Sequence, residues 1–212
     1  MKSIRYWHRN IQPLVNQHYR LHSDTTDTSR RVRADVGWNW WHYASYALGH
    51  NLAVRSHSAP PSLVCGWAMM LALQGQKPAR VPVGLLTAVP DFVCHVGGTT
   101  GGRGFVWYLS NAPAEFFRDK IKAPALEGIA EALLDTTIQT RLDFCGDATT
   151  LLHAEPEGGS RLQSFYRGLG MKEVTMSERV SLFRGAKPGE YFGFEDKEAR
   201  TFADRFASRR GQ

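Results

Sequence analysis

Residues 161–174 (RLQSFYRGLGMKEV) constrain the fold more than any other part of the chain. The apolar residues of this block recur at the spacing of one helical face, namely Leu162, Phe165, Tyr166 and Leu169. Gly170 then predicts the end of the helix, because glycine readily adopts the left-handed conformation of a helix C-cap. A strand-like run follows over 174–183. The block therefore predicts a helix that stops at a glycine and leads directly into a strand.

The size and composition of the chain are those of a globular protein. With 212 residues and 42% hydrophobic content, it can bury the core of one domain, or of a domain with an appendage. No apolar run reaches the ~20 residues that span a bilayer, and the N-terminus lacks the apolar core of a signal peptide. Three scattered cysteines fit a reducing compartment. We therefore expect a cytoplasmic protein without a membrane partner.

The net charge of +6 raises the question of an acidic partner. Arginines gather at 30, 31 and 33, and again at 205, 209 and 210, but neither group has the interleaved aromatics of a nucleic-acid platform. A modest positive charge also suits an enzyme that holds the phosphates of a nucleotide cofactor. Nucleic acid is thus a possible partner that the sequence does not support.

Periodicity and turn residues predict an order of elements along the chain. Strands are expected at 4–7, 63–73, 81–89, 105–111, 149–154 and 174–183. Helices are expected at 11–22, 36–52 (with Gly49 ending it), 126–142, 160–169 and 196–208. Loops or turns are expected at 23–33, 74–80, 97–104 and 187–194. The expected division is a domain over 1–184 and a C-terminal tail over 185–212 with a short amphipathic helix.

This order, together with the Phe165-Tyr166-x-x-x-Gly170 ending of the helix, resembles the GNAT-type (Gcn5-related) N-acetyltransferases from residue 4 to about 184. The resemblance implies an α+β fold in which a mixed, mostly antiparallel sheet is flanked by helices in α/β/α layers. It also implies transfer of an acetyl group from acetyl-CoA to a primary amine by direct attack. The acceptor, whether a small molecule or a peptide, is not identified by the sequence.

The resemblance also assigns chemical roles to residues. Tyr166 would protonate the departing thiolate of coenzyme A, and backbone groups of Leu109, Ser110 and Asn111 would polarise the thioester carbonyl. In some family members, a carboxylate about a dozen residues before the tyrosine is the base. Here Ala154 holds that position, and the neighbouring His153 is the expected base because its unperturbed pKa is ~6.5. Asp91, His95 and Glu115 are alternatives.

Two registers are open for the phosphate-binding loop. In the first, Gly128, Ile129 and Ala130 hold the pyrophosphate at a helix N-terminus. Ala125 then stands where the family has arginine or glutamine, and Glu127 has the wrong charge for a phosphate. In the second, Pro124 begins the helix, and the loop before it would supply the charges of Lys120 and Lys122.

The aromatic segment 38–46 leads to a rival hypothesis. Trp38, Trp41 and Tyr43 either line an acceptor site or form a contact surface for another protein. The rival is a catalytically degenerate GNAT-fold adaptor that uses this helix as its contact surface. A third hypothesis is an acetyltransferase toxin acting on charged tRNA, which the net charge permits.

Other sites are not supported by the sequence. His18 and His22 are four residues apart, but Tyr19 follows His18 where zinc proteases need a glutamate, so no metal is expected. The glycine-rich turn at 97–104 lacks the Gly-Lys-Ser/Thr ending of a Walker loop.

Overall fold

The computed structural model describes residues 1–55, 62–74, 79–176 and 190–210. Its helices are α1 (Lys2–Asn10), α2 (Gln12–His18), α3 (Trp40–Val54), α4 (Ala114–Phe116), α5 (Ile129–Cys145), α6 (Gly159–Leu169) and α7 (Asp196–Asp204), with the π-helix η2 (Phe117–Ile121) and the 3-10 helices η3 (Pro156–Gly158) and η4 (Ala207–Arg209). Its strands are β1 (Tyr19–Arg20), β2 (Arg31–Val32), β3 (Cys65–Leu73), β4 (Ala79–Val96), β5 (Thr99–Asn111), β6 (Thr150–Ala154), β7 (Lys172–Val174) and β8 (Glu190–Phe194).

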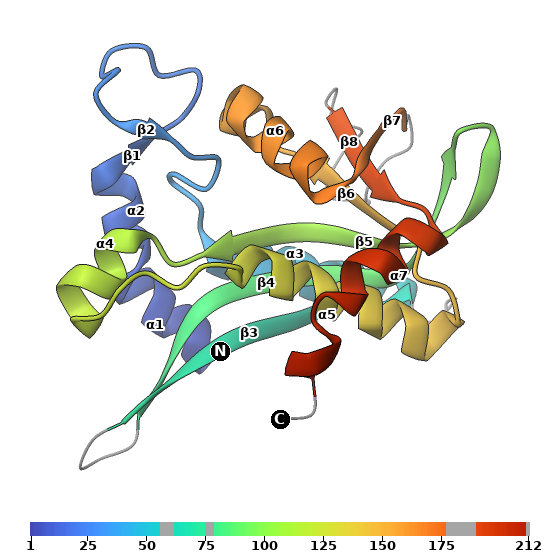
Figure 1. The fold of residues 1–212 in the computed structure, drawn as a ribbon, viewed down its shortest axis with the longest axis horizontal. Coiled ribbons are helices and arrows are strands. Elements are labelled where there is room, and N and C mark those ends of the chain that lie inside the picture. Colours follow the sequence, from blue (N-terminus) through green and yellow to red (C-terminus); the bar gives the residue numbers. More distant parts are fainter. Residues whose placement is uncertain (56–61, 75–78, 177–189, 211–212) are drawn as a thin grey trace.

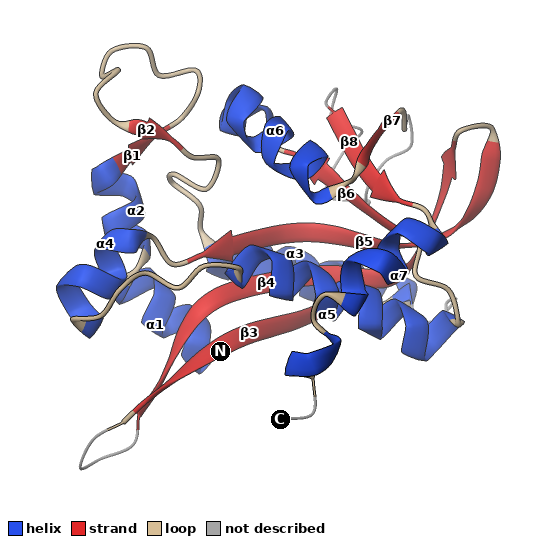
Figure 2. Cartoon of the chain, in the orientation of Figure 1, coloured by secondary structure: helices blue, strands red, loops and turns tan. Residues whose placement is uncertain are grey.

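Six of these strands form one sheet in the order β3-β4-β5-β6-β8-β7 (Figure 1). Neighbouring strands are antiparallel except for β5 and β6, which are parallel. β1 and β2 form a separate parallel pair. Helices lie against the sheet (Figure 2). The fold class expected from the sequence, a mixed and mostly antiparallel sheet flanked by helices, is confirmed.

Helices α3 and α5 cover opposite faces of the long strands. A Cβ added to Gly84 of β4 would lie 2.8 Å from side-chain atoms of both Ile129 and Leu133, so α5 packs directly on the backbone there. On the other face, Tyr43 of α3 stacks on Tyr108 of β5 at 3.7 Å between ring centroids. Gly84 thus serves as a close-approach glycine that brings the start of α5 onto the sheet.

The N-terminal predictions need correction. Residues 4–7, expected as a strand, belong to helix α1, because Ile4, Trp7 and Ile11 share one helical face and the last two are fully buried. The expected helix over 11–22 ends at His18, where β1 begins. Gly49 does not end α3, which continues to Val54.

The C-terminal part also differs from expectation. Residues 190–194, expected within a loop, form β8, which lies between β6 and β7 although its segment was assigned to the tail. Gly193 suggested a loop, but its backbone pairs with both neighbouring strands. The last helix ends at Asp204 rather than 208. The expected strand over 174–183 begins at Lys172, and its part from 177 on, the 184/185 boundary and turn residues 75–78 lie outside the described residues.

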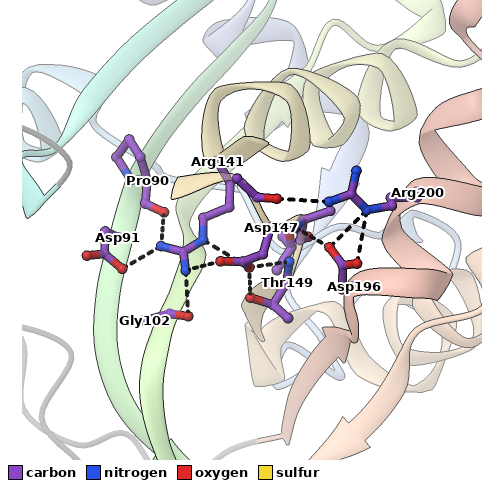
Figure 3. A network of polar contacts seen from close by, with 11 residues as sticks. Pro90, Asp91, Gly102, Arg141, Asp147, Thr149, Asp196 and Arg200 are labelled. Carbon is purple, nitrogen blue, oxygen red and sulfur yellow. Dashed lines mark hydrogen bonds and ion pairs between the residues drawn. The ribbon is translucent and has the colours of Figure 1, made fainter. Parts of the chain in front are cut away.

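A buried arginine connects the elements near the point where β5 and β6 pair (Figure 3). Arg141 of α5, 5% exposed, forms ion pairs with Asp91 of β4 and, at 2.5 Å, with Asp147 before β6. It also donates to the carbonyls of Pro90 and Gly102 at 3.3 and 3.0 Å. One side chain therefore holds α5, β4, β5 and the start of β6 together.

No helix in the described part of the chain combines the length and apolar character needed to cross a membrane.

Candidate active site

A cleft opens where the sheet divides. β5 and β6 pair at only three positions, of which the last joins Val106 to Leu152. Beyond that pair, β5 continues to Asn111 beside β4, whereas His153 and Ala154 of β6 pair only with β8. The two parallel strands therefore separate toward their C-terminal ends, and a cleft of about 620 Å³ lies there.

Five segments supply most of the cleft wall. They are residues 31–35 before α3, residues 106–111 of β5, residues 126–131 at the start of α5, the end of β6 with Leu152, His153 and Glu155, and the region of α6 with Gly158, Arg161, Leu162, Phe165 and Tyr166. Tyr19 and Trp38 complete the lining. The structure thus brings together these predicted site residues: Trp38, Leu109, Ser110, Asn111, Gly128, Ile129, Ala130, His153 and Tyr166.

The backbone of β5 presents peptide groups to this cleft. Just past the strand, the N–H of Ala112 donates to the carbonyl of Val83 on β4 at 2.8 Å. Peptide groups alternate in direction along a strand, so those of Leu109 and Asn111 point away from β4, toward the cleft. The Asn111 carbonyl does accept a hydrogen bond from the Arg33 guanidinium. The N–H groups of Leu109 and Asn111 are therefore available as donors to a carbonyl oxygen.

Residues 19–35 form a strap that is attached to both sides of the cleft. On the β5 side, Arg33 pairs with Asp35 at 2.5 Å, and Ser110 donates to the same carboxylate. On the β6 side, the Ser23 backbone and hydroxyl donate to Glu157 of η3 at 3.0 and 2.7 Å. Burial opposes the charge on Arg33, but the Asp35 carboxylate raises its pKa overall. Arg33 therefore keeps its positive charge, and its contacts with Asp35 and Asn111 fix the strap to β5.

Tyr166 lies on the α6 wall and is 9% exposed. Its ring packs against Phe165 and Phe192, with centroids 5.5 Å away in both cases. Burial raises the pKa of Tyr166 well above its usual value, and the negative charge of Asp35 raises it further. The phenol is therefore neutral at physiological pH and keeps a proton to donate.

His153 of β6 is the second predicted catalytic residue. It is also 9% exposed, and its ring is 4.9 Å from that of Tyr191 on the neighbouring strand. The structure places it in the cleft lining together with Tyr166. The predicted acid and the predicted base therefore share one cavity but come from different elements.

The three alternative bases have other contacts. Glu115 accepts from the Tyr19 hydroxyl at 2.9 Å and pairs with Arg31 at 3.2 Å. Burial alone would raise the pKa of Glu115, but these hydrogen bonds and the arginine charge lower it. Asp91 pairs with Arg141, and His95 contacts Thr100 at 3.0 Å. None of the three carboxylate or imidazole groups lines the cleft.

The N-terminus of α5 lies at the cleft, as expected from the first of the two registers predicted for the phosphate-binding loop. Gly128, in the left-handed conformation with φ 77°, is the N-cap, and the helix begins at Ile129. The register in which Pro124 begins the helix is therefore wrong. The first helical hydrogen bond joins the N–H of Ala132 to the Gly128 carbonyl at 2.9 Å, so the N–H groups of 129–131 precede it.

The N–H groups of residues 129–131 suit a pyrophosphate, but the carboxylates of two glutamates lie beside them. No side chain caps the helix, and Gly128, Ile129 and Ala130 all line the cleft. Glu127 and Glu131 line it as well, and their charge opposes a bound phosphate. Lys120 and Lys122 are exposed and do not line the cleft.

Of the aromatic segment, only Trp38 lines the cleft. Tyr43 packs against Trp38 and Tyr108 on α3's inner face, and Trp40 is 3% exposed. Trp41 is half-buried and lies outside the lining.

The residues of the strap were not predicted as site residues, because a polar segment without periodicity predicts only a loop. The sequence feature that could have indicated them is the arginine cluster followed by Asp35.

Among the described residues, no group of three or more His, Cys, Asp or Glu side chains is arranged to hold a metal ion. No protein-family model and no curated protein matches the chain. A chain of a solved structure described as the crystal structure of the KacTA–DNA complex is similar, with 13% sequence identity and a TM-score of 0.41, over 89% of this chain and 94% of that chain. The similarity is too distant to assign an activity, so function is argued from the cleft itself.

Proposed function

We propose that the cleft binds acetyl-CoA and that the protein transfers the acetyl group to a primary amine. One observation carries the proposal: outward peptide groups of β5, an uncapped helix N-terminus and a buried neutral phenol line a single cleft. These are the donors that thioester aminolysis needs at the carbonyl, at the phosphates and at the leaving sulfur.

The residues would act as follows. One of the N–H groups of β5 that point away from β4, that of Leu109 or of Asn111, binds the carbonyl oxygen as negative charge develops on it. The amine nitrogen forms a bond to the carbonyl carbon and loses a proton to His153. The carbon–sulfur bond then breaks, and the thiolate takes the proton of the Tyr166 phenol. The products are the N-acetylated amine and free coenzyme A.

Calorimetric titration with acetyl-CoA tests the binding step. We expect micromolar affinity, and no measurable heat at millimolar ligand would refute the proposal. Free thiol released with a panel of primary amines then measures turnover. Tyr166→Phe should lower turnover at least about tenfold with an unchanged Kd, since general acid catalysis typically contributes 10²–10⁴-fold. Tyr6→Phe, which removes a hydroxyl on α1 outside the cleft, is the matched control.

A non-catalytic adaptor is the second candidate, and it is favoured by a specific observation. Glu127 and Glu131 flank the helix end that would receive the pyrophosphate. In addition, Leu48 and Leu52 of α3 are 61% and 64% exposed, as expected of a protein-binding helix. Absence of acetyl-CoA binding by a folded protein would favour this candidate.

A further inference from the structure

One edge of the central sheet is built from an uncharged strand. β3 (Cys65–Leu73) has the sequence CGWAMMLAL and, among the described residues, pairs with no strand but β4. Edge strands are usually protected by charged residues, by proline or by being short. β3 has nine residues and neither a charge nor a proline. The N-terminal segment does not extend the sheet here, because residues 4–7 are helical and β1 pairs with β2.

The direction of the peptide groups along β3 follows from the pairing of β4. Val83 of β4 accepts from the N–H of Ala112, so this residue and every second one after it face β5. Leu86 therefore faces β3, where it pairs with Trp67. Before the register shift that the β3–β4 pairing shows between Met69 and Met70, Gly66 and Ala68 therefore turn their N–H and C=O groups away from the sheet. The shift skips Val83 of β4, so the alternation continues along β3 and gives Met70 and Ala72 the same direction.

Within the described part of the chain, no backbone or side-chain hydrogen bond satisfies those outward groups. In the part of the chain that the structure describes, the one side-chain hydrogen bond to these residues from another element is that of the Ser3 hydroxyl, 3.9 Å from the Met70 sulfur. An extended segment is the occupant that such an edge fits, since its own N–H and C=O groups supply the missing partners.

We propose that the occupant is β3 of a second copy of this chain, paired antiparallel across a two-fold axis at Met69. This register aligns the two strands over their full length and places Ala68 opposite Met70 of the second copy. Each β3 residue whose backbone groups point away from the sheet then lies opposite such a residue of the second copy, and the two residues form two N–H···O=C hydrogen bonds with each other.

The strand is complementary to itself in its side chains as well. On one face of the two paired β3 strands, Trp67 would lie opposite Leu71 of the second copy, and Met69 would lie opposite Met69 of the second copy. All of these pairs are apolar, so the pairing brings no like charges together in a chain of net charge +6. A symmetric contact of this kind closes as a dimer.

Apolar surface continues beside the strand. Met70 is 40% exposed, and Asn51 of α3 joins its helix to the start of β3 through two hydrogen bonds with Val64, at 2.9 and 2.7 Å. Next to Asn51 lies the exposed Leu52, and Leu48 is one turn earlier on the helix. The dimer would lie next to these exposed apolar side chains.

Sedimentation equilibrium of the full chain, combined with cysteine cross-linking, tests the proposal. We expect a dimer. Met69→Cys should form a disulfide-linked dimer under mild oxidation, because the two side chains meet on the axis in a pair with Cα atoms about 4.5 Å apart. Leu71→Cys is the matched control, since it would face Trp67. The native Cys65 would face Leu73, so the unmodified chain should not cross-link through it.

Lysine substitutions at the edge give a second readout. Met70→Lys and Ala72→Lys should each weaken dimerisation at least about tenfold, because edge lysines oppose strand pairing. Gln17→Lys adds the same charge on α2 and should leave the dimer intact. Circular dichroism verifies folding of each variant. A monomeric wild type, or a dimer that resists both lysines and cross-links equally through positions 69 and 71, would overturn the proposal.

Discussion

At the scale of single residues, Arg141 is expected to contribute strongly to stability outside the apolar core. Its guanidinium is buried and neutralises Asp91 and Asp147. Arg141→Ala should lower the free energy of unfolding by about 3 kcal/mol, because breaking a buried ion pair leaves its partners uncompensated. Arg118→Ala, which removes an exposed pair with Asp119, should change it by less than about 1 kcal/mol. Urea denaturation measures both, and equal effects would contradict the assignment.

The same cluster predicts a pH dependence. Burial alone would raise the pKa of Asp147, but hydrogen bonds from Arg141 and Thr149 lower it overall. A carboxylate with a lowered pKa stabilises the folded state above its unfolded pKa, and this stability is lost as the pH falls through the folded value. Below about pH 4 the unfolding free energy should therefore drop. The drop should be smaller in Arg141→Ala; identical pH profiles would exclude this coupling.

Residues found from the sequence differ in kind from those that were missed. Tyr166 and Gly128 belong to local patterns, a helix ending and one of two possible helix starts, and the structure places both in the cleft. Asp35 and Arg33 act through Ser110 and Asn111, which are more than seventy positions away along the chain. Such contacts form only in the folded chain, so no spacing of residues in the sequence predicts them.

At the scale of elements, the start of α5 decides whether the cleft favours a phosphate. Glu127 is exposed beside the uncapped N-terminus, where its charge opposes a second anion. If the pyrophosphate binds there, Glu127→Gln should tighten acetyl-CoA binding by about three- to fivefold, equivalent to up to ~1 kcal/mol. Asp143→Asn makes the same charge change near the other end of the helix and is the control. Unchanged affinity in Glu127→Gln would place the phosphates elsewhere.

Elements were predicted well where the chain's own periodicity is strong and poorly where short segments depend on partners. Helices α5 and α6 and strands β3 and β6 lie within a few residues of their expected bounds. Residues 4–7 alternate in a way that also fits a strand, and only Ile11 in the next turn completes the helical face. β8 contains Gly193 and owes its conformation to pairing with β6 and β7.

At the scale of the whole molecule, the sheet consists of two parts joined by a short parallel contact. β3, β4 and β5 form one part, and β6, β8 and β7 form the other. Three residue pairs between β5 and β6 connect them, supported by Arg141 and the strap. A ligand in the cleft would touch both parts, so its binding energy should stabilise the complete fold rather than one segment.

That expectation leads to a prediction for the folded chain. Acetyl-CoA at 100 times its Kd should stabilise the protein by about 2.7 kcal/mol and raise Tm by roughly 5–10 °C. Hydrogen exchange should slow at the amides of 109–111 and of 129–131 together, since both segments line the same cleft. Tyr166→Phe should show the same shift in Tm, because its hydroxyl acts on the departing sulfur and not in binding. Protection of only one of the two segments would mean that the ligand does not bridge β5 and α5, and the proposed geometry of transfer would then fail.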